Sequence, residues 1–148
     1  RPFAETEFKH ILHDHVFRTP VRSFGWGMLL TVLVQSSSVS TSLLVPIAGL
    51  GILQLERIFP YILGANIGTT VTALLAATVT GSAAAVTVGL VHFFFNVLGS
   101  FIVYPMRKVP IALSKLLAEA SLKNRIFPIT YVCCLFFILP ALVIYFFR

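Results

Sequence analysis

The stretch Leu29–Gly49, LLTVLVQSSSVSTSLLVPIAG, decides how this chain folds. Both of its ends are apolar enough for the interior of a membrane. Its middle, QSSSVSTS at residues 35–42, is almost entirely polar and carries no charge. A single helix crossing a membrane here would bring a glutamine and a cluster of hydroxyls to the depth of lipid tails. The stretch therefore predicts a polar interruption at membrane depth, flanked by two short apolar arms.

The composition indicates that the whole chain is an integral membrane protein. Apolar residues make up 57% and charged residues only 11%, against about 25% charged residues in a soluble domain. No charge occurs between Ser23 and Leu55, between Ile58 and Met106, or between Ile126 and Phe147. Each gap can hold at least one spanning helix of about 20 residues. We therefore predict an all-α membrane fold.

The net charge of +6 does not indicate a nucleic-acid partner, because the basic residues flank apolar blocks, as Lys and Arg beside membrane spans do. Cys133 and Cys134 are adjacent within an apolar run and do not form a metal pair. The chain opens on Arg1 without a methionine. We expect it to be a piece of a longer protein.

Residues 23–54 predict a re-entrant helical hairpin with Gln35–Ser38 at its tip. The apolar arms, 24–34 and 43–53, are too short to form two full spans. Unwound backbone is tolerated at this depth where protein or a water-lined cavity surrounds it. The alternative is one span with a polar centre. The basic residues favour the hairpin, because with two later crossings it keeps every Lys and Arg up to Arg125 on one side.

The rest of the chain divides at its polar segments. Gly64–Thr72 is rich in glycine and hydroxyls, and it predicts a second interruption between two half helices; the alternative is a GxxxG packing motif at Gly64 and Gly68. The predicted elements are an amphipathic interfacial helix over residues 1–22, a broken transmembrane helix over 58–80, transmembrane helices over 83–105 and 126–147, and a basic surface segment over 106–125.

The two interruptions have a chemistry that suits ions. A helix that starts within the membrane presents free N–H groups to an anion, and one that ends there presents carbonyls to a cation. Hydroxyl and amide side chains serve either. Neither interruption contains a charged residue, so sodium ions would supply the positive charge that accompanies a bound anion. Discontinuous helices of this kind are the usual construction of sodium-coupled transporter sites.

Gln35-Ser36-Ser37-Ser38, followed by GANIGTT at residues 64–70, resembles the type II sodium-dependent phosphate cotransporter family in its bacterial form. The resemblance covers roughly residues 20–105. In that family a QSSS motif occurs in each of two inverted repeats, with a G-(A/S)-N-(I/V)-G-T motif downstream. The continuation at residues 69–75, TTVTALL, looks more like the second repeat. The resemblance implies one C-terminal inverted-repeat half of a transporter, whose partner half comes from a missing N-terminal segment or another copy.

The resemblance also implies a function, sodium-coupled inorganic phosphate symport by alternating access, in a multi-pass protein of the inner cell membrane. It implies sodium as the coupling ion, no other cofactor, and contact with the lipid bilayer. The expected phosphate-binding residues are Gln35, Ser36, Ser37, Ser38 and Asn66, and the expected sodium-binding residues are Thr69, Thr70, Thr72 and Ser40.

Three alternatives stay open at this point: transport of another oxyanion, export of phosphate, and a non-transport scaffold subunit. An enzyme is not expected, because the intramembrane residues supply no nucleophile–base pair and no metal-binding set.

Overall fold

The structure, a computed structural model, describes residues 12–147. This part of the chain is built from helices and the turns between them, and it separates into two compact units, one ending at Arg107 and one beginning at Lys108. The first unit contains the π-helical turn η1 (Leu12–Val16) and the helices α2 (Pro20–Val34), α3 (Ser37–Ser42), α4 (Leu44–Gly49), α5 (Leu55–Val79) and α6 (Ala83–Val103).

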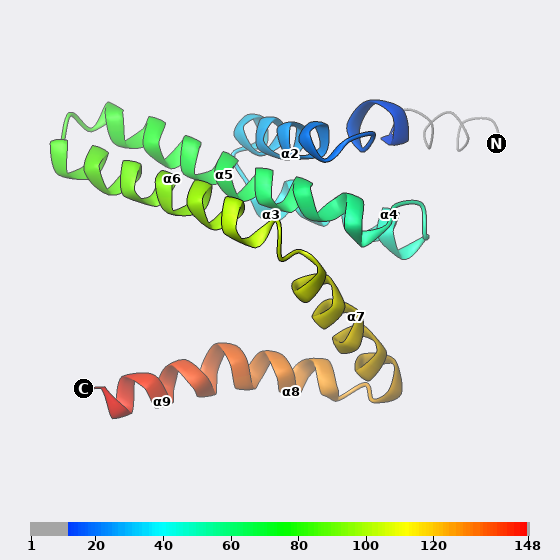
Figure 1. The fold of residues 1–148 in the computed structure, drawn as a ribbon. Helices are drawn as coiled ribbons and strands as arrows, with labels where there is room; N and C mark the ends of the chain where they lie inside the picture. The colour runs from blue at the N-terminus through cyan, green and yellow to red at the C-terminus, as the bar shows by residue number, and fades with distance from the viewer. Residues whose placement is uncertain (1–11, 148) are drawn as a thin grey trace. The chain divides into compact units, whose positions relative to one another are not determined.

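Helix α5 is the centre of the first unit, with α2 and α6 packed along it (Figure 1). Both α5 and α6 are long and apolar enough to cross a membrane. Helix α2 has 15 residues, so it reaches only about 22 Å at 1.5 Å per residue. That length falls short of the roughly 30 Å hydrocarbon core. The arm formed by α3 and α4, Ser37–Gly49, is also shorter than a span.

Glycine allows α2 and α5 to pack with their backbones in contact. A Cβ atom on Gly27 would collide with the carbonyl of Tyr61, and one on Gly64 would collide with the carbonyl of Phe24. A Cβ on Gly68 would lie 2.7 Å from the carbonyl oxygen of Met28. From the Phe24–Gly64 contact to the Met28–Gly68 contact both helices advance by four residues, so α2 and α5 run parallel. This close approach is typical of small residues between membrane helices.

The predicted break in the helix over residues 58–80 is wrong. Helix α5 is continuous from Leu55 to Val79, and Gly64 and Gly68 both keep helical backbone geometry. Its threonines satisfy their hydroxyls within the helix, because these donate to carbonyls three or four residues earlier. The alternative, a GxxxG packing motif, describes what the structure shows: these glycines bring α2 close rather than unwind α5.

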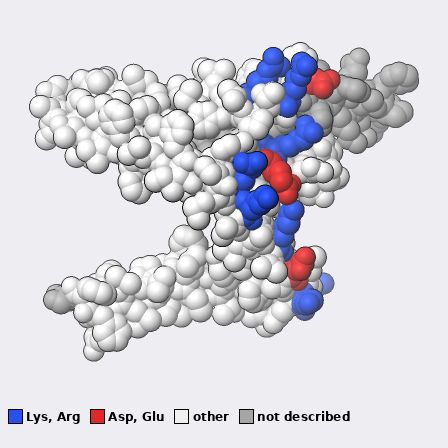
Figure 2. Space-filling model, in the orientation of Figure 1, with Lys and Arg blue, Asp and Glu red and all other residues white. Residues whose placement is uncertain are grey.

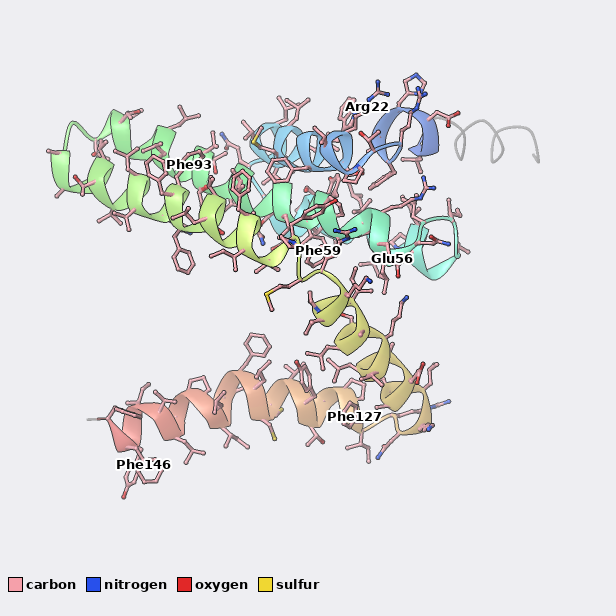
Figure 3. All side chains as sticks on the ribbon, viewed as in Figure 1. Arg22, Glu56, Phe59, Phe93, Phe127 and Phe146 are labelled. Atoms are coloured by element: carbon pink, nitrogen blue, oxygen red, sulfur yellow. The ribbon has the colours of Figure 1, made fainter. Side chains whose placement is uncertain are left out.

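Charged side chains in the first unit gather at one end. Because α2 and α5 run parallel and α6 returns antiparallel, the starts of α2 and α5 and the end of α6 lie together, carrying Arg22, Glu56 and Arg107. Figure 2 shows this end blue and red, whereas the far end of α5 and α6 is white. In Figure 3, Arg22 and Glu56 lie at that end and Phe93 lies away from it. We call this the charged end of the first unit.

The second unit contains α7 (Lys108–Lys123), α8 (Phe127–Cys133), the π-helical turn η2 (Cys134–Ile138) and α9 (Leu139–Phe146). The last three form one apolar rod, Phe127–Phe146, long enough to span a membrane. The π-turn precedes Pro140, and the N–H of Leu139 donates to the carbonyl of Cys134. A proline removes one backbone donor and crowds the preceding turn, so the wider turn accommodates Pro140 within the helix.

The first half of the predicted interfacial helix over residues 1–22 lies outside the described residues, which begin at Leu12. Within them, η1 ends at Val16 and α2 begins at Pro20, with Thr19 as its N-cap. The side chain of Thr19 accepts the N–H of Arg22 at 3.3 Å. A capping threonine followed by proline is a common helix start, so the chain starts a new helix here.

Candidate functional site

The backbone turns at Gln35 and Ser36, between the end of α2 and the start of α3. Gln35 has φ 56° and ψ 24°, and it is the only non-glycine residue with positive φ among the described residues. Ser36 is extended, and its Oγ accepts the N–H of Val39 at 3.3 Å. That bond caps α3 in the usual manner of a serine. The motif Gln35–Ser38 therefore spans the end of one helix and the start of the next.

Some polar side chains at and after the turn are hydrogen-bonded, and others are not. Thr41 donates to the carbonyl of Ser37 at 2.7 Å, and Ser42 donates to that of Val39 at 3.0 Å. Within residues 12–147, the Gln35 amide and the hydroxyls of Ser37 and Ser38 have no hydrogen-bond partner. Gln35 and Ser38 are exposed and Ser37 is half-buried. The turn therefore carries polar groups that are available to a ligand.

A buried polar cluster holds the hairpin formed by α2, α3 and α4 against α5. The Oγ atoms of Thr31 and Ser40 lie 2.8 Å apart in a hydrogen bond. The hydroxyl of Tyr61 lies 3.2 Å from the Ser40 carbonyl and 3.3 Å from its Oγ. These side chains are 0–2% exposed. One residue comes from each of α2, α3 and α5, and we call the three the Thr31–Ser40–Tyr61 cluster.

The predicted sodium ligands on α5 lie within about one turn of a regular helix. Thr69 donates to Ala65 O at 3.2 Å, Thr70 to Ile67 O at 2.7 Å and Thr72 to Thr69 O at 2.8 Å. Thr69 and Thr72 are half-buried, whereas Thr70 is 1% exposed. A hydroxyl that donates to a carbonyl keeps lone pairs for a cation. The accessible pair, Thr69 and Thr72, can therefore accept an ion without leaving the helix.

The packing of α2 on α5 sets the height of the turn. Thr31 packs on Gly68, since a Cβ on Gly68 would lie 2.9 Å from the Thr31 Cβ. In parallel helices each further residue rises by the same 1.5 Å. Helix α2 continues past Thr31 to Val34, so the turn at Gln35 follows the Thr31–Gly68 contact in the direction in which α5 leads to Thr69 and Thr72.

The structure joins some predicted site residues and leaves others apart. Ser40 contacts α5 through Tyr61. The side chain of Asn66 is exposed, and it makes no hydrogen bond to Gln35–Ser38. The sequence prediction missed Thr31 and Tyr61. Each carried a weak signal, a lone polar group on an apolar helix at one helical turn from Gln35 or from Gly64.

The geometry defines a helical membrane protein with three candidate spans and a helix-turn-helix element whose turn is polar and charge-free. Comparison with known proteins identifies its family. Residues 1–122 match the Na+/Pi-cotransporter family, and the chain belongs to that family. This confirms the sequence resemblance.

Among curated proteins, the chain is 42% identical over 122 residues to sodium-dependent phosphate transport protein 2A of Oryctolagus cuniculus, covering 79% of this chain and 19% of the relative. It is 43% identical over 122 residues to protein 2B of Homo sapiens, with 79% and 18% covered. It is 43% identical over 131 residues to protein 2C of Rattus norvegicus, with 79% and 22% covered.

The chain spans about a fifth of the length of these relatives. Their names are those of transport proteins, in agreement with the prediction that the chain is not an enzyme. No solved structure shows a significant match.

Proposed function

We propose that this chain is one repeat of a sodium-coupled inorganic phosphate symporter that works by alternating access. Membership of the Na+/Pi-cotransporter family is the observation that carries the proposal. The complete site then needs a second inverted repeat, from a preceding segment or another copy of the chain. A multi-pass protein of the inner cell membrane, surrounded by lipid, is part of the same proposal.

In this proposal Gln35, Ser36, Ser37 and Ser38 bind phosphate. Three of these side chains have no partner within the described residues, and the turn stands where a helix begins. The start of a helix favours an anion through its free N–H groups. No charge lies between Ser23 and Leu55 to compete with a phosphate or to neutralise it. Asn66 completes the set on the α5 side.

Sodium then supplies the positive charge that the protein lacks around the turn at Gln35–Ser38. Thr69 and Thr72 are the first candidates, because both are only half-buried and follow Gly68, the residue on which Thr31 packs. Thr70 and Ser40 belong to the same proposal, but their hydroxyls are buried and bonded. Burial keeps an ion from both hydroxyls unless the packing around them opens. Coupling follows if phosphate is held firmly only when sodium is bound.

We propose further that α2 and α3–α4 form a re-entrant hairpin. Both arms are shorter than a span. The hairpin starts near Arg18 and Arg22, at the beginning of α2, and returns to Arg57, in the first turn of α5. Entering and leaving by one membrane face keeps these arginines in the polar layer, as the distribution of Lys and Arg beside membrane spans favours.

The test is uptake of labelled phosphate by vesicles that contain the complete gene product, in sodium and in potassium. Gln35→Ala and Ser37→Ala should each reduce sodium-dependent uptake by about tenfold or more, since each removes a polar contact to a charged ligand. Ser42→Ala is the control, because it removes an exposed hydroxyl from the same hairpin. Uptake that does not depend on sodium, or that both variants leave intact, would refute the proposal.

A further inference from the structure

The Thr31–Ser40–Tyr61 cluster is the polar contact that connects both arms of the hairpin to α5. Thr31 stands on the outgoing arm, Ser40 on the returning arm and Tyr61 on α5. The hydrogen bonds join them in sequence, from Thr31 Oγ1 to Ser40 Oγ and from there to the Tyr61 hydroxyl. The Ser40 carbonyl gives Tyr61 a second acceptor. The cluster therefore fixes three helices relative to one another.

Because the Thr31–Ser40–Tyr61 cluster is buried, its hydrogen bonds cannot be replaced by hydrogen bonds to water. Thr31 is 0% exposed, Ser40 1% and Tyr61 2%, and no buried side-chain oxygen in residues 12–147 lacks a partner. A hydroxyl that lost its partner here would have no water to replace it, and that loss is costly. The hairpin cannot slide along α5 without leaving such groups unpaired.

The ring of Tyr61 is held as firmly as its hydroxyl. Phe17 packs against it with ring centroids 5.8 Å apart, and Arg57 Nη1 donates to the Phe17 carbonyl at 3.3 Å. On the other side, Gly27 brings the α2 backbone onto the Tyr61 carbonyl. Tyr61 is thus fixed at both ends, and Ser40 is bonded to a side chain that has little freedom to move.

We propose that Tyr61 is a positioning residue for the polar turn. By holding Ser40, two residues after the QSSS motif, its hydroxyl sets the height of Gln35–Ser38 beside Thr69 and Thr72, so that the hairpin and the first half of α5 move as one body. Tyr61 itself touches no substrate. The consequence for transport rests on the proposed function, whereas the rigid connection does not.

Two measurements on Tyr61→Phe test this role. Spin labels at Leu43→Cys and Val79→Cys, both exposed positions, report the distance between the hairpin and α5 by pulsed electron resonance. Native cysteines, Cys133 and Cys134 among them, are first replaced by serine. We expect the distance distribution to broaden in Tyr61→Phe. Tyr145→Phe, which removes the same hydroxyl from an exposed residue, should leave it unchanged.

In the second measurement, phosphate uptake by the unlabelled complete gene product should show an apparent KM raised about fivefold with the maximal rate per transporter retained, because the competent position of the turn is less populated. A loss of maximal rate per transporter with KM unchanged would contradict the positioning role. Unchanged label distances and unchanged KM in Tyr61→Phe would overturn the positioning role while leaving the proposed function intact.

Ser40→Ala provides the second variant, because it removes the shared oxygen and keeps the tyrosine ring. It breaks the bond to Thr31 but leaves the carbonyl of residue 40 as an acceptor for Tyr61, so it should broaden the distances less than Tyr61→Phe does. It also keeps the role testable if Tyr61→Phe does not fold. If Ser40→Ala weakened only the response to sodium and left the distances narrow, Ser40 would be an ion ligand and the positioning role would be wrong. Broadened distances in a protein without sodium-dependent uptake would refute the transport function and keep the positioning role.

Discussion

Two polar, uncharged stretches of this chain have opposite backbone structures. Residues 35–42 and 64–72 both combine amides with hydroxyls in an apolar surrounding, and only the second contains glycine. The backbone turns in the first, at Gln35 with positive φ, and stays helical through the second. The glycines therefore do not mark the break. They mark where another helix needs space, and the break falls where a serine can cap a new helix.

The largest expected effect tests the packing role of glycine on α5. Gly64→Ala should destabilise the protein by about 3 kcal/mol, because the new methyl group collides with the Phe24 carbonyl and neither backbone can yield. Thermal unfolding of the purified protein in detergent measures it. Gly25→Ala, where nothing lies within 4 Å of the new Cβ, should be neutral or stabilising. Equal effects would contradict a packing role.

Amide hydrogen exchange compares the two stretches directly. The N–H groups of Ile67–Val71 should exchange roughly a hundredfold more slowly than those of Ser37 and Ser38, because the first set is bonded within a continuous helix and the second stands at a helix start. Mass spectrometry of the protein in nanodiscs gives both rates at once. Fast exchange across residues 64–72 would contradict a continuous α5 and support the break that the sequence predicted.

Replacement by glycine should change the free energy of unfolding in opposite directions in the two stretches. Gln35→Gly should stabilise by about 1 kcal/mol, since an L-residue pays a conformational cost at positive φ that glycine avoids. Asn66→Gly should destabilise by about 0.5 kcal/mol, because Asn66 is within a helix. Both are read from unfolding curves. Uptake should nevertheless fall in Gln35→Gly, which separates the backbone role of this residue from its side chain. A destabilising Gln35→Gly would refute the assigned turn geometry.

The smallest expected effect on stability is that of Thr72→Val, which tests the proposed sodium site. Thr72→Val should change stability in potassium by about 0.5 kcal/mol or less, since only a bond to the Thr69 carbonyl is lost. It should also reduce the rise in melting temperature that sodium produces. Thr78→Val is the matched control: Thr78 makes the same kind of bond, to Leu75 at 2.6 Å, near the exposed end of α5. A sodium response that is reduced equally in both variants would exclude a specific role for Thr72.

Much of the helical organisation was predictable from the spacing of charges. The apolar runs after Ser82 and after Ile126 gave helices close to the predicted ranges, since a membrane span is determined by length and composition alone. The turn at Gln35–Ser38 was predictable too, because two arms of that length cannot each span. The continuity of α5 was not, because glycine and threonine serve equally in an unwound segment and in a tightly packed helix.

The residues of the buried cluster were beyond the reach of sequence patterns. Thr31, Ser40 and Tyr61 are separated by up to 30 residues, and nothing in their local sequence links them. Ser40 was expected to bind sodium because hydroxyls suit cations. Its burial and its bonds to Thr31 and Tyr61 became visible only when three helices were placed together.

The sequence by itself determined that the chain is a helical membrane protein, which family it belongs to, and where its polar turn lies. These follow from local composition and from a motif of a few residues. Only the tertiary structure decided that α5 is continuous, that its glycines make room for α2, and that Tyr61 is hydrogen-bonded to Ser40. The physical reason is that one hydroxyl or one glycine satisfies several environments equally well, and the neighbour that packs against it selects among them.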